Sequence, residues 1–191
     1  MCALRPGKLS FINTDIFYLP IMNSNNIGIQ FHFRGADMPE FHKDLISVGL
    51  KAQTAEDAIR RMSDAMLSMG IVKPGYANSV IEREKTFPTG LSGVAPAAIP
   101  HTTSDQVESP GIAIAQLESP VKFGCMDDPD KTLEVRLIFL LAIKDPKAQL
   151  TTLQGLSATF QNTDVMTRLE NPGSIMDFMA ALEESGWQSC D

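Results

Sequence analysis

The amino-acid sequence predicts an α/β domain in which a mixed β-sheet is flanked by helices on both faces. Residues 134–143 (EVRLIFLLAI) are almost continuously apolar and rich in branched side chains, which is typical of a strand covered on both faces. Segments with helical spacing alternate with strand-like segments, and this order indicates helices layered on a sheet. The 191 residues are enough to bury one hydrophobic core without disulfides or a structural metal.

The first regular element is expected to begin at Thr54, which forms a variant of the capping box with Asp57. Gly70 is expected to end this helix. A short second helix is predicted over 77–84, and residues 87–100, rich in Pro, Gly and Ala, are predicted to be a loop. The first helix carries an apolar stripe at helical spacing, which we expect to face the core: Ala58, Ile59, Met62, Ala65, Met66 and Met69.

Three strands are predicted in the second half, over 111–117, 121–123 and 134–143. A helix should follow the turn at residues 144–146, and a last helix should start at Ser174. The first of these helices is expected to carry Leu150, Leu153, Leu156 and Phe160, and the last to bury Ile175, Phe178, Met179 and Leu182.

Residues 1–40 differ from the rest because their apolar side chains follow no clear period. We expect an N-terminal extension, disordered or loosely packed, before a domain that covers 41–188. A further hypothesis is that Met22 or Met38 is the true initiator, which the intact mass of the natively expressed protein would decide.

Composition excludes several classes of function. The formal net charge of -7 argues against nucleic-acid binding, which needs a basic surface. Three cysteines without a Cys-x-x-Cys pair disfavour a disulfide framework or a zinc site and fit a reducing cytoplasm. No apolar run approaches the roughly 18 residues that span a bilayer, and the N-terminus lacks the apolar stretch of a signal peptide. We therefore expect a soluble, cytoplasmic protein without membrane insertion.

His101 is the strongest candidate for chemistry among three histidines; His32 and His42 are interpreted as surface residues. Pro100 fixes its own φ and holds Ile99 extended. The hydroxyl and carboxylate side chains at 102–105 could cap a helix or leave backbone N–H groups pointing at an anion. Neutral imidazole is nucleophilic near pH 7, so His101 could accept a phosphoryl group. The alternative is an ordinary exposed histidine. No Walker A, GxGxxG, HExxH or GxSxG motif is present.

The runs Arg83-Glu84-Lys85, Pro88-Thr89-Gly90 and Ala98-Ile99-Pro100-His101 together resemble the signature of enzyme IIA of the bacterial phosphotransferase system, fructose–mannitol type. The strands and the helix that follow are similar as well, so the resemblance covers about residues 45–185. It implies a type-2 enzyme IIA domain in which His101 is phosphorylated. Arg83 would neutralise the transferring group with its planar guanidinium, and otherwise would be a solvated helix charge.

Two further residues follow from the resemblance. Many members carry a second active-site histidine at the start of the helix after the long strand, where this chain has Gln149. Galactitol-type proteins resemble this chain there. Gln149 could donate a hydrogen bond to a phosphoryl oxygen, or it could be a helix-cap or surface residue. Thr89 could support the loop or contact the phosphoryl group.

The resemblance implies a phosphoryl relay for uptake of a sugar alcohol such as galactitol. His101 would take the phosphoryl group from the histidine-containing phosphocarrier protein and pass it to a cysteine of a cognate enzyme IIB. No cofactor or metal is expected, because positioning and fixed donors stabilise the transferring group. The alternatives are a regulatory IIA-like protein, whose phosphorylation state controls binding to other proteins, and a structural module without phosphotransfer.

Overall fold

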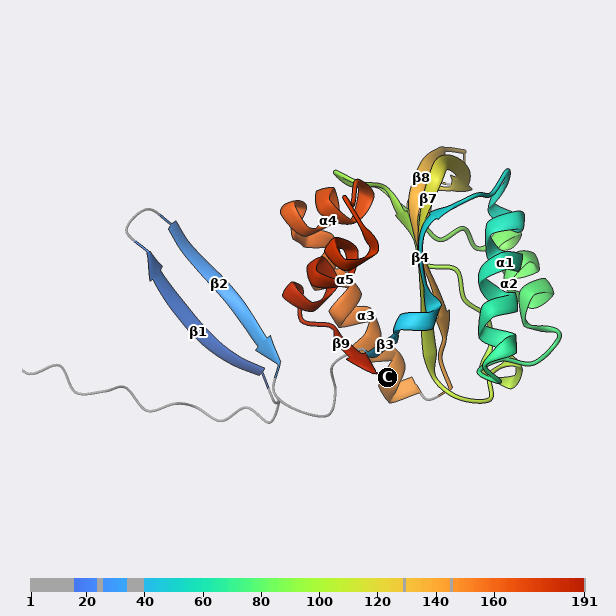
Figure 1. The fold of residues 1–191 in the computed structure, drawn as a ribbon, viewed down its shortest axis with the longest axis horizontal. Helices are drawn as coiled ribbons and strands as arrows, with labels where there is room; N and C mark the ends of the chain where they lie inside the picture. The colour runs from blue at the N-terminus through green and yellow to red at the C-terminus, as the bar shows by residue number, and fades with distance from the viewer. Residues whose placement is uncertain (1–15, 24–25, 34–39, 129, 145, 191) are drawn as a thin grey trace, which may run out of the picture. The chain divides into compact units, whose positions relative to one another are not determined.

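The computed structural model describes the backbone of residues 16–23, 26–33, 40–128, 130–144 and 146–190, and side chains from residue 41 onward except at 129, 145–151 and 191. The chain divides into two units, 1–37 and 38–191. In the first unit, β1 (Ile16–Asn23) pairs antiparallel with β2 (Asn26–Phe33) (Figure 1). The sequence analysis had assigned no element to this segment. The placement of the first domain boundary at residue 40 stays a prediction.

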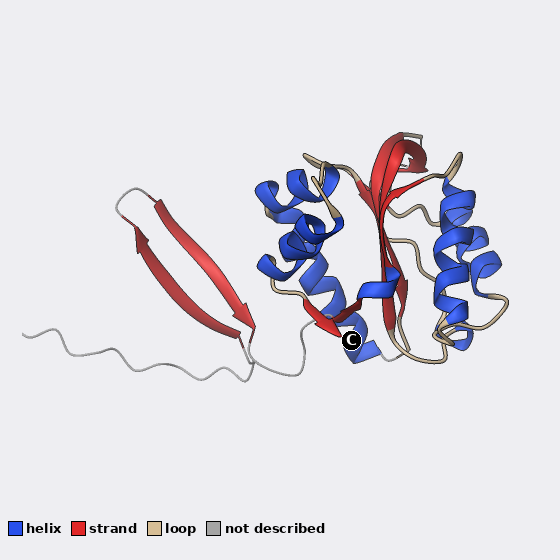
Figure 2. Cartoon of the chain, viewed as in Figure 1, coloured by secondary structure: helices blue, strands red, loops and turns tan. Residues whose placement is uncertain are grey.

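The second unit is built on a five-stranded mixed sheet in the order β4-β7-β8-β6-β5. Figure 2 shows the strands of this unit in red with helices in blue on either side. The pairs β4–β7 and β6–β8 are parallel, whereas β7–β8 and β5–β6 are antiparallel. The predicted α/β class with a mixed sheet is therefore confirmed. Its strands are β4 (Ile46–Leu50), β5 (Gly90–Leu91), β6 (Ala97–Ala98), β7 (Gly111–Gly124) and β8 (Thr132–Ala142). A separate parallel pair joins β3 (Glu40–His42) to β9 (Gln188–Cys190).

Helices cover both faces of this sheet, as Figure 1 shows. One face packs on α1 (Ala55–Ser68) and α2 (Tyr76–Thr86), and the other on α3 (Pro146–Gln161), α4 (Thr163–Glu170) and α5 (Ile175–Glu184). No helix in the described part of the chain is long and apolar enough to cross a membrane. Strand β8 supplies both cores by alternation: Ile138, Leu140 and Ala142 face one, and Leu137, Phe139 and Leu141 the other.

The first predicted helix is confirmed in its position and both ends. Thr54 is the N-cap of α1, and its hydroxyl accepts a hydrogen bond from the N–H of Asp57 at 3.1 Å. Gly70 adopts a φ of 70°, which a glycine tolerates without strain. The predicted stripe was wrong at Met69, which follows the helix and is 40% exposed.

Other elements differ from the sequence analysis. The segment 87–100 was predicted to be all loop, but it contains the two short strands β5 and β6. The two strands predicted over 111–117 and 121–123 are one strand, β7, whose register shifts between Gln116 and Val121. Strand β4 and helix α4 were not predicted. Ile175 was expected to be buried and is 45% exposed, because it begins α5 at the surface.

Candidate functional site

His101 lies three residues after the end of β6, beside β8, the central strand of the sheet. Pro100 is buried, and its carbonyl oxygen accepts a hydrogen bond from the N–H of Leu141 at 3.0 Å. His101 itself forms a parallel bridge with Leu141 of β8. The backbone on both sides of the imidazole is thus attached to the most buried strand of the sheet, which limits how far the ring can move.

The His101 ring is half-buried, and one of its two nitrogens is engaged. Nδ1 lies 2.9 Å from the carbonyl oxygen of Ile99. A carbonyl oxygen only accepts, so Nδ1 carries the proton and the lone pair of the neutral ring lies on Nε2. Burial lowers the pKa of His101, and the positive charge of Arg83 lowers it further, while the bond to Ile99 acts in the opposite direction. The ring is therefore held in its neutral, nucleophilic form.

Arg83 lies on α2, and its positive charge acts on the His101 imidazole. Its side chain is half-buried, and its guanidinium carbon lies 5.7 Å from the centre of the Phe87 ring. Phe87 is 62% exposed, so the pair lies at the surface, and its cation–π contact restrains the guanidinium. The arrangement places a permanent positive charge close to a neutral nucleophile.

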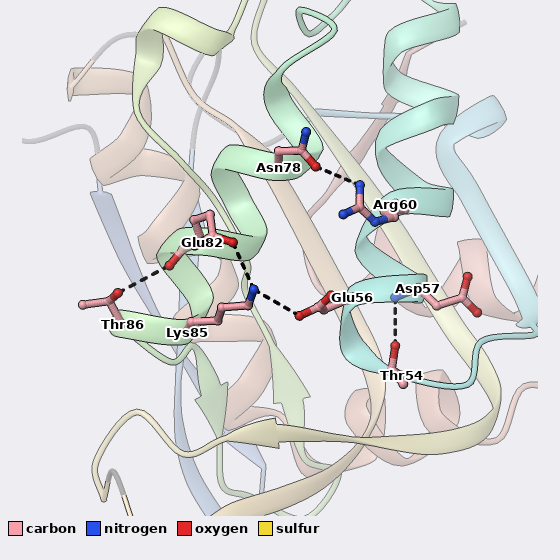
Figure 3. Close-up of polar contacts among 8 residues, drawn as sticks. All are labelled: Thr54, Glu56, Asp57, Arg60, Asn78, Glu82, Lys85 and Thr86. Atoms are coloured by element: carbon pink, nitrogen blue, oxygen red, sulfur yellow. Dashed lines mark hydrogen bonds and ion pairs between the residues drawn. The ribbon is translucent and has the colours of Figure 1, made fainter.

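Helix α2 is attached to α1 by polar side chains along the seam between them (Figure 3). Lys85 lies 3.4 Å from a carboxylate oxygen of Glu56 on α1 and 3.0 Å from one of Glu82. Arg60 of α1 donates a hydrogen bond to Asn78 of α2 at 2.9 Å. Exposed contacts of this kind contribute little to stability, so the buried apolar side chains of both helices carry most of the attachment.

Thr89 is 1% exposed, and its donors are both directed at Glu84 of α2. Its hydroxyl donates to Glu84 Oε2 at 2.7 Å, and its backbone N–H donates to Oε1 at 2.8 Å. The side chain of Gln149 lies outside the described residues, although its backbone belongs to α3. From the sequence, Glu84 was named only as part of the run Arg83-Glu84-Lys85. The five-residue spacing to a threonine across a helix end was the signal available.

The hydroxyl-rich segment after His101 forms a single turn of 3-10 helix over Ser104–Gln106. Thr103 makes no side-chain cap with it, and its hydroxyl donates to the Asp105 carboxylate instead. Of the two possibilities that the sequence left open for this segment, a side-chain cap is not formed at Thr103.

Comparison with protein families gives one match over most of the chain. Residues 40–185 match the model described as "Phosphoenolpyruvate-dependent sugar phosphotransferase system, EIIA 2". The match includes Arg83, Thr89, His101 and Gln149.

Two curated relatives from Escherichia coli (strain K12) are similar to this chain. One, a "PTS system galactitol-specific EIIA component", is 29% identical over 122 residues, which are 63% of this chain and 81% of the relative. The other, a "PTS system mannitol-specific EIICBA component", is 27% identical over 155 residues. That alignment covers 80% of this chain but only 23% of the much longer relative.

A solved structure shares the fold. It is a complex of enzyme IIAMTL and phosphorylated enzyme IIBMTL from Escherichia coli, matched with a TM-score of 0.62 and 28% identity over 74% of this chain and 95% of the solved chain.

Proposed function

The chain belongs to the phosphoenolpyruvate-dependent sugar phosphotransferase system EIIA 2 family, and from this membership we propose that it relays phosphoryl groups between two proteins through His101. Domains of this family are phosphotransferases that act on other proteins. The proposed donor is the histidine-containing phosphocarrier protein, and the proposed acceptor is a cysteine of a cognate enzyme IIB. The relay would take place in the cytoplasm.

One observation supports this role above all: the state of the His101 ring. With Nδ1–H donated to Ile99, the lone pair on Nε2 is the nucleophile. In the first step this lone pair attacks the phosphorus in line, an Nε2–P bond forms, and the N–P bond to the donor histidine breaks with its electron pair remaining on the donor ring. In the second step a thiolate of enzyme IIB attacks, an S–P bond forms, and the electron pair of the Nε2–P bond returns to His101.

The surrounding residues have proposed roles that follow from their chemistry. The transferring group carries negative charge on three oxygens, and the Arg83 guanidinium can neutralise two of them through a fixed fork of N–H donors. Thr89 supports the loop, because its hydroxyl is already committed to Glu84 and is buried. Gln149 donates a hydrogen bond to a phosphoryl oxygen.

The proposed substrate class for transport is a sugar alcohol such as galactitol. The relatives named above are described as galactitol-specific and mannitol-specific, and both compounds are sugar alcohols. A partner of the enzyme IIB kind is supported by the solved complex of enzyme IIAMTL with phosphorylated enzyme IIBMTL.

The test is a reconstituted relay with phosphoenolpyruvate, enzyme I and the phosphocarrier protein. The full chain should gain one acid-labile phosphate, measured by intact mass, and should lose it when a galactitol-type enzyme IIB is added. His101→Ala should gain none, while His42→Ala should behave as wild type. Phosphate on the His101→Ala variant would overturn the assignment. Phosphorylation of wild type without onward transfer to any sugar-alcohol enzyme IIB would replace the transport role with the regulatory one.

A further inference from the structure

Both carboxylate oxygens of Glu84, on helix α2, accept hydrogen bonds. Both of its oxygens are used by one residue, Thr89, through the hydroxyl at 2.7 Å and the backbone N–H at 2.8 Å. Burial raises the pKa of Glu84 overall, and the two bonds from Thr89 and the charge of Arg83 only partly offset this rise. Hydrogen bonds to an ionised group are among the strong ones in proteins. The contact therefore closes the turn between the end of α2 and β5.

The same turn leads to the phosphoryl-accepting histidine by two further hydrogen bonds. The carbonyl oxygen of Thr89 accepts the N–H of Ile99 at 3.3 Å, and the carbonyl oxygen of Ile99 accepts the Nδ1–H of His101 at 2.9 Å. The pairing of Gly90 with Ala98 lies between these contacts. A continuous path thus runs from the Glu84 carboxylate through Thr89 and Ile99 to the imidazole.

Strand β5, which follows Thr89, is also held in place by the segment at the end of β7. A side-chain carbon at Gly90 would lie 2.5 Å from the carbonyl oxygen of Gly124, so β5 lies directly against the end of β7. The N–H of Met126 donates to the carbonyl oxygen of Gly90 at 2.8 Å. Thr89 can therefore shift only if the turn to α2 opens, and Glu84 is the side chain that keeps it closed.

We propose that Glu84 is a positioning residue for phosphoryl transfer: by clamping Thr89 it fixes the Ile99 carbonyl that holds His101 with a proton on Nδ1 and a free Nε2. This inference rests on the proposed relay through His101, and it adds a residue that does not itself touch the phosphoryl group. Because Glu84 follows Arg83 on α2, the same contact also restrains the end of the helix that carries the guanidinium. If the imidazole is displaced from its position in line with the phosphorus, phosphoryl transfer is slower, since small displacements of reacting groups slow a reaction strongly.

The test compares substitutions of equal size. Glu84→Gln keeps the shape of the side chain, but its amide can accept only one of the two donors from Thr89. Glu82→Gln is the matched control, since Glu82 lies on the same helix, is exposed and bonds Lys85. Thr89→Val removes the hydroxyl donor, and Thr89→Ser retains it.

The first readout needs no phosphate. In the full chain labelled with 15N at histidine, the chemical shifts of the two ring nitrogens report the tautomer of His101. Glu84→Gln should lower the fraction of the Nδ1–H form, and Glu82→Gln should leave it unchanged. A wild-type tautomer in Glu84→Gln would overturn the inference, whether or not the protein accepts phosphate.

The second readout is the rate of phosphorylation by the phosphocarrier protein. Glu84→Gln should lower kcat by roughly tenfold with little change in KM, since it displaces the nucleophile and not the docking surface. Thr89→Ser should retain more of kcat than Thr89→Val. If Glu84→Gln fails to fold, judged by its circular dichroism, Thr89→Val carries the test, and wild-type kcat in that variant would overturn the inference. A wild type that takes no phosphate would instead overturn the proposed function.

Discussion

At the scale of single residues, the state of the His101 ring determines what the site can do. Burial is the main cause that lowers its pKa below the ordinary value of 6.5. A titration of the ring by NMR should therefore give a pKa below 6.5. The rate at which His101 accepts a phosphoryl group should be retained in mildly acidic solution until the ring protonates. The unfolded chain binds this proton more readily, so between the two pKa values the free energy of unfolding should rise with pH. A pKa above 6.5 would contradict burial as the dominant influence on the ring.

Arg83 gives a second prediction at this scale. In Arg83→Gln the pKa of His101 should rise, because the positive charge of Arg83 lowers it in the wild type. The rate of phosphoryl transfer should fall by about a hundredfold, the usual effect of removing a fixed donor to a developing charge. Arg60→Gln is the control, because Arg60 is exposed on α1 and bonds Asn78. An unchanged transfer rate would remove Arg83 from the mechanism.

At the scale of elements, Tyr76 ties the start of α2 to the strand beside His101. Its buried hydroxyl donates to the carbonyl oxygen of Leu141 at 2.7 Å, and burial raises the pKa of the phenol, so it remains a donor. Tyr76→Phe should lower the free energy of unfolding by roughly 1–3 kcal/mol, the cost of an unsatisfied buried acceptor.

Urea unfolding would measure this cost, with Ser68→Ala as the control at an exposed hydroxyl. That control should change stability by less than about 0.5 kcal/mol. Equal midpoints for Tyr76→Phe and wild type would show that the hydroxyl does not support this junction.

Elements with a strong local pattern could be predicted from the sequence. The capping residues of α1 and the continuous apolar run of β8 are local signals, and both elements lie where expected. Strand β4 could not be found in this way, because Gly49 interrupts a segment of only five residues. Its pairing with β7 also joins residues far apart in the chain, such as Ile46 and Ile114. The short strands β5 and β6 exist only through pairing with each other and β8.

The residues of the candidate site also differ in whether the sequence could predict them. His101 and Arg83 could be singled out because a short motif surrounds each of them in the sequence. The contact of Glu84 with Thr89 could not, since it depends on the direction in which the chain leaves α2. The bond from His101 to Ile99 likewise depends on backbone geometry and not on residue type.

At the scale of the whole molecule, the function should reside in the second unit. Residues 38–191 form one compact unit, and the family match at 40–185 lies within it. A chain that begins at Met38 should unfold cooperatively and accept phosphate at a rate close to that of the full chain. Circular dichroism and the phosphorylation assay would check this. Loss of either property would show that residues 1–37 contribute to the relay domain.

Nε2 of His101 is the proposed carrier of the phosphoryl group, and correlated 1H–31P NMR of the phosphorylated full chain tests this role most directly. A phosphorus on Nε2 should couple to both ring carbon protons of His101, which flank that nitrogen. We predict this pattern and a single phosphorus signal that disappears in acid. A phosphorus signal assigned to another residue, or to Nδ1 of His101, would contradict it.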